Sequence, residues 1–163
     1  MRHIAKLIGL SAIVAAFVAP AAAQAADATA TGLVDGTVTA GSTVCSWTNA
    51  VTSDVPSNTL TIDNATVNPP GGNLGCNDGT GLVLNNDPVV TFNDAAGTAA
   101  ADAIDVTVTK SGISCRYRAE GIDMTRDGTT RHYSGGPYTG IKTGGSFLCP
   151  GTATIDTADV WFH

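Results

Sequence analysis

The stretch IDVTVT at residues 104–109 carries the pattern that decides the fold. Its apolar residues, Ile104, Val106 and Val108, are separated by single polar residues, so the two kinds alternate with a period of two. Such alternation is typical of a β-strand with one buried face and one solvated face. TATID at residues 152–156 repeats the pattern, so we expect strands in both places.

Two further stretches predict strands and the turns between them. LTID at residues 60–63 begins an alternating pattern, and residues 65–67 continue it if residues 63–64 form a turn or bulge. Asp127-Gly128 is a strong hairpin signal, and it predicts a turn that joins Ile122–Thr125 to Thr129–Tyr133.

Composition favours the same fold class along the whole chain. Thr, Val, Gly, Asn and Asp are abundant, whereas the helix formers Leu, Glu, Lys and Met are scarce. The one helix-like stretch, Ala95–Ala103, is interrupted by Gly97. We therefore predict an all-β domain, a single β-sandwich or Greek-key barrel of about 8–10 short strands.

The N-terminus has the three parts of a secretory signal peptide. Arg2 and Lys6 make a basic start, Leu7–Val18 is an apolar run, and Ala23-Gln24-Ala25 fits the small-x-small rule for cleavage. The apolar run is shorter than the roughly 20 residues of a membrane-spanning helix. We expect residues 1–25 to be removed, which leaves 26–163 as one domain without a transmembrane segment.

Four cysteines follow this leader, at Cys45, Cys76, Cys115 and Cys149. An even number of cysteines in an exported chain predicts two disulfides, because the compartment is oxidising. No CxxC or HxxxH pair is present to hold zinc.

A weak internal repeat organises the chain around these cysteines. VTAGSTVCSW at residues 38–47 matches VTKSGISCRY at 108–117, and GGNLGC at 71–76 matches GGSFLC at 144–149. Two cysteine-anchored matches in the same order indicate a duplication. We expect two related halves, about 30–93 and 103–163, joined by Asn93–Asp102 and sharing one core.

The repeat favours one disulfide connectivity and leaves another open. If each half closes on itself, the pairs are Cys45–Cys76 and Cys115–Cys149, which we prefer because short loops close more readily. The symmetric alternative, Cys45–Cys115 with Cys76–Cys149, would join the two halves.

Charge narrows the range of partners. The mature chain has a net charge of about −8, because the leader carries away two of the eight basic residues and none of the fourteen acidic ones. Lys and Arg are absent from Leu7 to Thr109. Nucleic acid and anionic lipid are poor partners for such a chain.

The sequence predicts no catalytic residues and no cofactor. The histidines of the mature chain, His132 and His163, accompany no nucleophile motif, and Glu120 is the only glutamate. The Asn- and Asp-rich stretches at residues 77–79, 85–87 and 93–94 offer oxygen ligands for a weak structural calcium, but none follows a known calcium-loop pattern.

Tyr133 and Tyr138 flank Gly135-Gly136-Pro137 and form the one candidate exposed aromatic patch for ligand binding. The other aromatic residues have a different prediction. Trp47 and Tyr117 each stand two residues after a half-cystine, which favours packing against the disulfides.

The phrases SGISCRY at residues 111–117 and LCPGT at 148–152, with the signal peptide and the Gly-, Thr- and Asn-rich strands, resemble small bacterial secreted proteins of the alkane-oxidation activator (PraB-like) family. The resemblance covers most of the mature chain, apart from its acidic, lysine-free first half. It implies a non-enzymatic extracellular protein associated with biofilm or hydrophobic growth substrates.

We therefore expect a non-enzymatic secreted protein that acts at the cell surface or in the extracellular biofilm matrix, by self-association or by contact with hydrophobic substrates. Periplasmic retention is the alternative location. A carbohydrate-binding or other ligand-binding module is the alternative function, and a secreted hydrolase is the third.

Overall fold

The computed structural model describes residues 31–163, so the predicted signal peptide at 1–25 lies outside the described residues. The described chain forms one antiparallel sheet of 12 strands. The all-β prediction is confirmed, with more strands than the number expected. The additional strands are short, and several of them span only two to four residues.

The first half contains six strands and one short helix. They are β1 (Gly32–Ala40), β2 (Thr43–Thr52), β3 (Leu60–Thr61), α1 (Asn64–Val67), β4 (Gly75–Cys76), β5 (Gly81–Leu84) and β6 (Val89–Asn93). The second half contains β7 (Thr98–Lys110), β8 (Ile113–Arg126), β9 (His132–Gly135), β10 (Tyr138–Gly145), β11 (Thr152–Ile155) and β12 (Thr157–Phe162).

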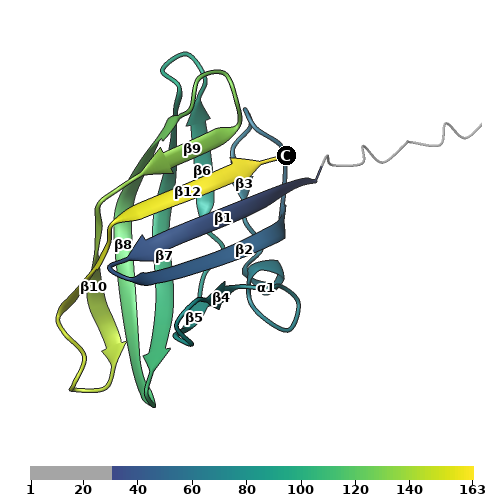
Figure 1. Ribbon diagram of the computed structural model, residues 1–163. Helices are drawn as coiled ribbons and strands as arrows, with labels where there is room; N and C mark the ends of the chain where they lie inside the picture. The colour runs from purple at the N-terminus through teal and green to yellow at the C-terminus, as the bar shows by residue number, and fades with distance from the viewer. Residues whose placement is uncertain (1–30) are drawn as a thin grey trace, which may run out of the picture.

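The sheet closes on itself. Its strand order is β3-β6-β7-β8-β9-β12-β1-β2-β4, and β2 also meets the chain beside β3 through the bridge between Thr52 and Ile62. Ser53 N donates to Thr61 O and Asp63 N donates to Val51 O, both at 2.9 Å. Figure 1 shows the result, in which β1, β2, β9 and β12 face the viewer and β6, β7 and β8 lie behind them. The barrel alternative therefore describes this sheet better than a sandwich.

Two long hairpins supply most of this wall. β1 and β2 are joined by Gly41-Ser42, and β7 and β8 by Ser111-Gly112. Gly41, Ser111 and Gly112 have φ of 58°, 52° and 79°, the positive values that tight two-residue hairpin turns require.

The repeat seen in the sequence recurs as a repeat of strand order. In the first half β2 pairs with β1 and β4, and in the second β8 pairs with β7 and β10. β3 pairs with β6 as β9 pairs with β12, and β6 pairs with β7 as β12 pairs with β1. The correspondence is partial, because β5 pairs with β7 whereas β11 pairs with β10, and because β8 also pairs with β9.

Equivalent hairpin residues also share their register. Val38 pairs with Cys45, and Val108 pairs with Cys115. The disulfides are Cys45–Cys76 and Cys115–Cys149, which close loops of 31 and 34 residues. These are the pairs that the repeat favours, and each disulfide lies within one half.

Three local expectations need correction. Residues 98–102 were expected to belong to a linker between the halves, but they form the start of β7, so only the turn at Asp94–Gly97 joins β6 to β7. The helix-like stretch Ala95–Ala103 forms this turn and the first part of β7, as the all-β prediction implies, and Ala99, Ala101 and Ala103 are buried.

The second correction concerns residues 64–67, and the third, below, concerns the start of β9. They form the one-turn helix α1 instead of continuing a strand, because the Asp63 side chain accepts a hydrogen bond from Ala65 N at 2.9 Å and caps the turn. Val67 is buried in this helix, so the prediction that it faces the core is right and the prediction that it lies on a strand is wrong.

The predicted hairpin at Asp127-Gly128 joins β8 to β9, with Thr125 opposite Ser134 and Arg126 opposite Tyr133. Its second strand begins at His132 and not at Thr129. Residues 127–131 form a longer loop, in which Thr130 N donates to Asp127 O at 3.1 Å.

The core fills the interior of the closed sheet. An aromatic cluster of Phe92, Tyr133 and Phe162 has ring centroids 5.2–6.0 Å apart and occupies the part of the interior between β6, β9 and β12. Within residues 31–163, no helix is long and apolar enough to cross a membrane.

Candidate ligand-binding site

An apolar cavity of about 190 Å³ lies inside the closed sheet. Side chains from both halves line it, and they include Val38, Leu82, Leu84, Val106, Val108 and Ile155. Protein interiors contain few voids larger than a water molecule, so a space of this size in a single domain is unusual. Its wall is almost wholly hydrocarbon, which suits an apolar occupant and disfavours water.

A change of inward face along the β7–β8 hairpin decides which of its residues reach this cavity. On β7, Ala101 and Ile104 both face the interior, although residues three apart in a regular strand lie on opposite faces. The inward-facing positions therefore change from odd to even numbers between these two residues. On β8 the change falls between Ala119 and Ile122, where Gly121 has a φ of 64°. The two changes lie opposite each other, and the pairing register is the same on both sides of them, with Ala101 opposite Ile122 and Ile104 opposite Ala119. The alternation at residues 104–108 therefore does supply the cavity wall.

Trp47 and Tyr117 occupy equivalent places in this wall, one in each half. Both line the cavity, and Tyr117 is buried while Trp47 is partly buried against the core. The cross-strand partner of Trp47 is Gly36. A Cβ at that glycine would overlap the six-membered ring of Trp47, so the indole needs glycine opposite it.

The hydroxyls of the two lining tyrosines are already bonded. Tyr117 Oη donates to Pro150 O at 3.2 Å, and Tyr138 Oη donates to Asp123 O at 2.5 Å. Burial raises the pKa of Tyr138, because the phenolate would lose its solvation there.

Tyr133 and Tyr138 therefore do not form an exposed patch. Tyr133 is fully buried in the aromatic cluster, where it packs on Phe92 and Phe162. Tyr138 does line a cavity, although the cavity is internal. The spacing of the two tyrosines around a Gly-Gly-Pro loop gave no sign that β9 is an inner strand of the sheet, paired with both β8 and β12.

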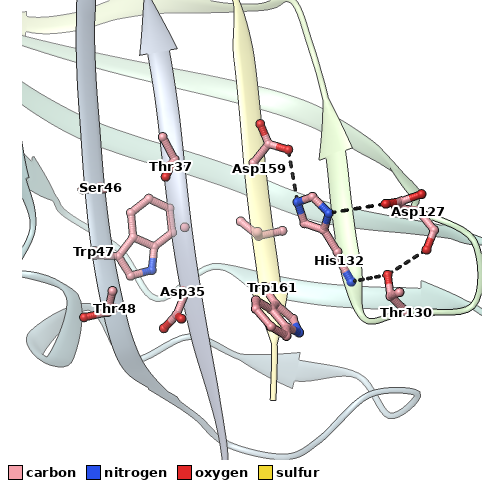
Figure 2. Close-up of a pocket in the computed structure, with 12 residues that line it drawn as sticks. Asp35, Thr37, Ser46, Trp47, Thr48, Asp127, Thr130, His132, Asp159 and Trp161 are labelled. Atoms are coloured by element: carbon pink, nitrogen blue, oxygen red, sulfur yellow. Dashed lines mark hydrogen bonds and ion pairs between the residues drawn. The ribbon is translucent and has the colours of Figure 1, made fainter.

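A second hollow, an open groove of about 500 Å³, crosses the outer surface of β2, β1, β12 and β9 (Figure 2). Its floor is the row of Trp47, Gly36 and Val160, in which the side chains of Trp47 and Val160 face the interior. Trp161 stands at its edge with 58% of its surface exposed. The sequence marked Trp161 only as part of the final strand, because nothing in the chain places β12 beside β1.

Polar groups surround the exposed indole. His132 lies 3.2 Å from Asp159 and 3.9 Å from Asp127, and His163 lies 3.3 Å from Asp35. The backbone N–H of Asn49 donates to Asp35 at 2.7 Å and, with His163, holds the pKa of that carboxyl below its usual value. The backbone N–H of His132 donates to Thr130 Oγ1 at 3.2 Å, and Thr37, Ser46 and Thr48 also line the groove.

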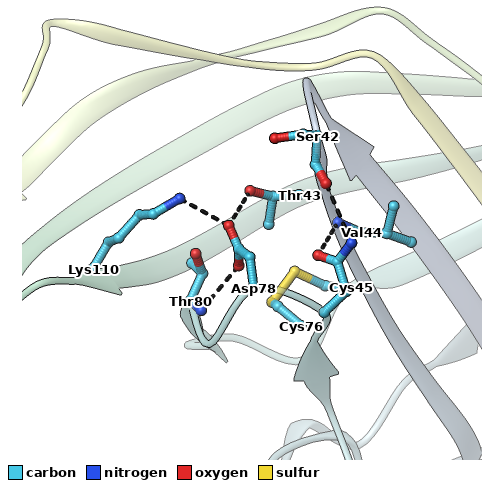
Figure 3. Close-up of a disulfide and its surroundings, with 9 residues drawn as sticks. Ser42, Thr43, Val44, Cys45, Cys76, Asp78, Thr80 and Lys110 are labelled. Carbon is cyan, nitrogen blue, oxygen red and sulfur yellow. Dashed lines mark hydrogen bonds and ion pairs between the residues drawn. A yellow bond between two sulfur atoms is a disulfide. The ribbon is translucent and has the colours of Figure 1, made fainter.

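The loops proposed as weak calcium ligands bond to the chain itself. Asp78 accepts from Lys110 Nζ and Thr43 Oγ1, both at 2.8 Å, next to the Cys45–Cys76 disulfide (Figure 3). These bonds lower the pKa of Asp78. Asn85 and Asn86 bond to β7 in a similar way. In the part of the chain that the structure describes, no group of three or more His, Cys, Asp or Glu residues is arranged to hold a metal ion.

Comparisons with protein families, with curated proteins and with solved structures find no match to this chain. The two hollows are therefore interpreted from their own geometry.

Proposed function

We propose that the mature chain is a non-enzymatic exported protein that takes a small apolar molecule into the cavity inside its closed sheet. The observation that carries this proposal is the cavity itself. An unfilled apolar cavity destabilises a protein by about 24 cal/mol for each Å³, so about 190 Å³ costs roughly 4–5 kcal/mol. A cost of that size in a domain of marginal stability is explained if a ligand fills the space.

The proposed location is the cell surface or the extracellular biofilm matrix. Two disulfides are compatible with an oxidising compartment. The resemblance to PraB-like proteins supports the same location and a link to hydrophobic growth substrates. An apolar tip on the outer surface, formed by Phe147 and Leu148 with 91% and 60% exposure, supports contact with such substrates or between copies.

The test of the cavity is a substitution that fills it. Ala101→Leu places three more carbon atoms toward the cavity, and Ala100→Leu makes the same change on the opposite face of β7 as a control. We expect methylcyclohexane to raise the melting temperature of the wild type and of Ala100→Leu, because a ligand that binds only the folded state stabilises it. Ala101→Leu should lose at least tenfold in affinity.

Unfolding in the absence of ligand checks that Ala101→Leu is folded. A volume-filling change of this kind should alter the free energy of unfolding by no more than about 1–3 kcal/mol. If the wild type shows no shift in melting temperature with methylcyclohexane or with other cyclic hydrocarbons of that size, the proposed function fails.

A carbohydrate-binding module is the second candidate, and the exposed Trp161 in the polar groove favours it. Aromatic faces stack on sugar rings, and the carboxylates of Asp35 and Asp159 can accept hydrogen bonds from sugar hydroxyls. We expect any binding of cellohexaose or chitohexaose to be abolished by Trp161→Ala and unchanged by Phe147→Ala, which removes an exposed aromatic residue outside the groove. Equal binding by both variants would overturn this candidate.

A further inference from the structure

Trp47 presents the interior with a hydrogen-bond donor that has no acceptor. Its Nε1 is buried, and no partner lies within hydrogen-bonding distance among residues 31–163. Such orphan groups are rare in proteins, and each of them costs about 1–3 kcal/mol. The other side-chain atom in this condition is Thr80 Oγ1, and Thr80 does not line the cavity.

The indole lies on the inner side of the sheet. Ser46 and Thr48 line the outer groove with exposed side chains, so Trp47 between them points inward. Its six-membered ring covers Gly36, whose neighbours Asp35 and Thr37 also face outward. Trp47 also lines the cavity, and neighbouring atoms cover its Nε1, so an acceptor in the cavity reaches this donor once the indole shifts.

The remaining polar groups at the cavity wall cannot serve as partners for a ligand. Tyr117 and Tyr138 direct their hydroxyl protons to backbone carbonyls. The rest of the wall is aliphatic or aromatic carbon. Within the described chain, Trp47 Nε1 is thus the donor left over in an otherwise apolar site.

We propose that the cavity selects small apolar molecules that carry one hydrogen-bond acceptor, such as a ketone, an aldehyde or an ester, and that Trp47 Nε1 donates to that acceptor. This inference rests on the proposed function, because it assigns the ligand class of the same cavity. A pure hydrocarbon fills the space but leaves the N–H unbonded. A sugar or a diacid brings several polar groups that the apolar wall cannot satisfy.

The experiment compares two probes of similar shape, methylcyclohexane and cyclohexanone, on the full mature protein. Affinities are measured for the wild type and for Trp47→Phe, which keeps an aromatic ring and removes the donor. We expect the ratio of ketone affinity to hydrocarbon affinity to fall about fivefold in Trp47→Phe, as the loss of one net hydrogen bond predicts. Trp161→Phe is the matched control, because it removes the other indole, and its ratio should equal that of the wild type.

A second measurement needs no substitution at Trp47. In ¹H–¹⁵N spectra the chain gives two indole resonances, and Trp161→Phe identifies which one belongs to Trp47. Cyclohexanone should move the Trp47 Nε1–H proton downfield, whereas methylcyclohexane should not. This readout decides the question even if Trp47→Phe fails to fold.

The outcomes separate the two proposals. If both probes bind and the affinity ratio and the indole shift are the same for ketone and hydrocarbon, the inferred ligand class is wrong while the cavity function stands. If neither probe binds the wild type, the cavity function is wrong, and the ligand class is wrong with it.

Discussion

Gly36 and Trp47 face each other across β1 and β2, and neither residue can be understood alone. The indole occupies the space where a side chain at position 36 would lie. In the second half the equivalent pair is Val106 and Tyr117, where a smaller ring faces a larger partner. In the first half a glycine faces a large indole, and in the second half a valine faces a smaller phenol ring. The two pairs fill similar volumes, which keeps the packing density of the core.

Asp105 is a buried carboxylate that is paired with an arginine on the neighbouring strand. It lies on β7 with its side chain buried, and Arg116 on β8 donates to it through Nε at 2.7 Å and Nη2 at 3.0 Å. This paired donation from Arg116 lowers the pKa of Asp105. Asn85, the residue that follows β5, donates to the same carboxylate through Nδ2 at 2.8 Å.

The first prediction concerns acid stability. A carboxyl with a lowered pKa stabilises the folded state above its unfolded pKa of about 3.9, and that stability is lost as pH falls through the folded value. We expect Asp105→Asn to be less stable than the wild type at pH 7 by about 1 kcal/mol, because Arg116 is half exposed and the pair is screened. The difference should shrink below pH 4.

Urea unfolding between pH 2 and pH 7 measures this effect. Glu120→Gln is the control, since the Arg118–Glu120 pair is more exposed and should contribute little. A constant difference between wild type and Asp105→Asn across this pH range would show that the carboxylate charge has no role.

At the scale of elements, the two disulfides support segments that differ in their own hydrogen bonding. Cys45–Cys76 attaches β4, whose ladder with β2 has only two residue pairs. Cys115–Cys149 attaches the loop after β10, and β10 already pairs with both β8 and β11. The two disulfides occupy equivalent positions in the sequence repeat. Cys45–Cys76 should nevertheless matter more for local structure, because β4 has fewer strand hydrogen bonds of its own than β10.

The second prediction follows from that inequality. Removing either disulfide by paired Cys→Ala substitution should lower the free energy of unfolding by about 3 kcal/mol, because the closed loops have similar lengths. Local hydrogen exchange should differ, however. Without Cys45–Cys76, the amide of Asn77, which donates to Val44 O, should exchange much faster.

The matched measurement is amide exchange in the variant that lacks Cys115–Cys149. There the β10–β11 amides should stay protected, because both strands keep their ladders. Equal loss of protection in the two variants would contradict the assignment of β4 as the segment that depends on its disulfide.

At the scale of the molecule, two apolar features of the described residues bear on function. One is the internal cavity, and the other is the tip formed by Phe147 and Leu148, in the loop between β10 and β11 seen at the lower left of Figure 1. A side chain such as Phe147, with 91% exposure, is costly in water unless something covers it for part of the time.

The third prediction tests this tip as a contact for hydrophobic surfaces. Phe147→Ser with Leu148→Ser should reduce adsorption to hexadecane droplets at least tenfold, because each of these side chains contributes about 1.5–3 kcal/mol when it leaves water. Val44→Ser with Val83→Ser, at partly exposed positions elsewhere, is the control. Sedimentation of the same proteins reports self-association, and unchanged adsorption in the tip variant would remove the tip from the proposal.

The sequence by itself determined the strand class, the helix-poor composition, the repeat and the disulfide pairs that it favours, because these depend on side-chain periodicity and on the separation of residues along one chain. Only the tertiary structure decided that the sheet closes, that Tyr133 is buried and that Trp47 lines an apolar cavity. These features depend on strand neighbours such as β1 and β12, which lie far apart in the chain. The inner and outer faces exchange on β2 where its register against β1 shifts near Asn49, and on β8 near Gly121, and periodicity alone cannot place such a change.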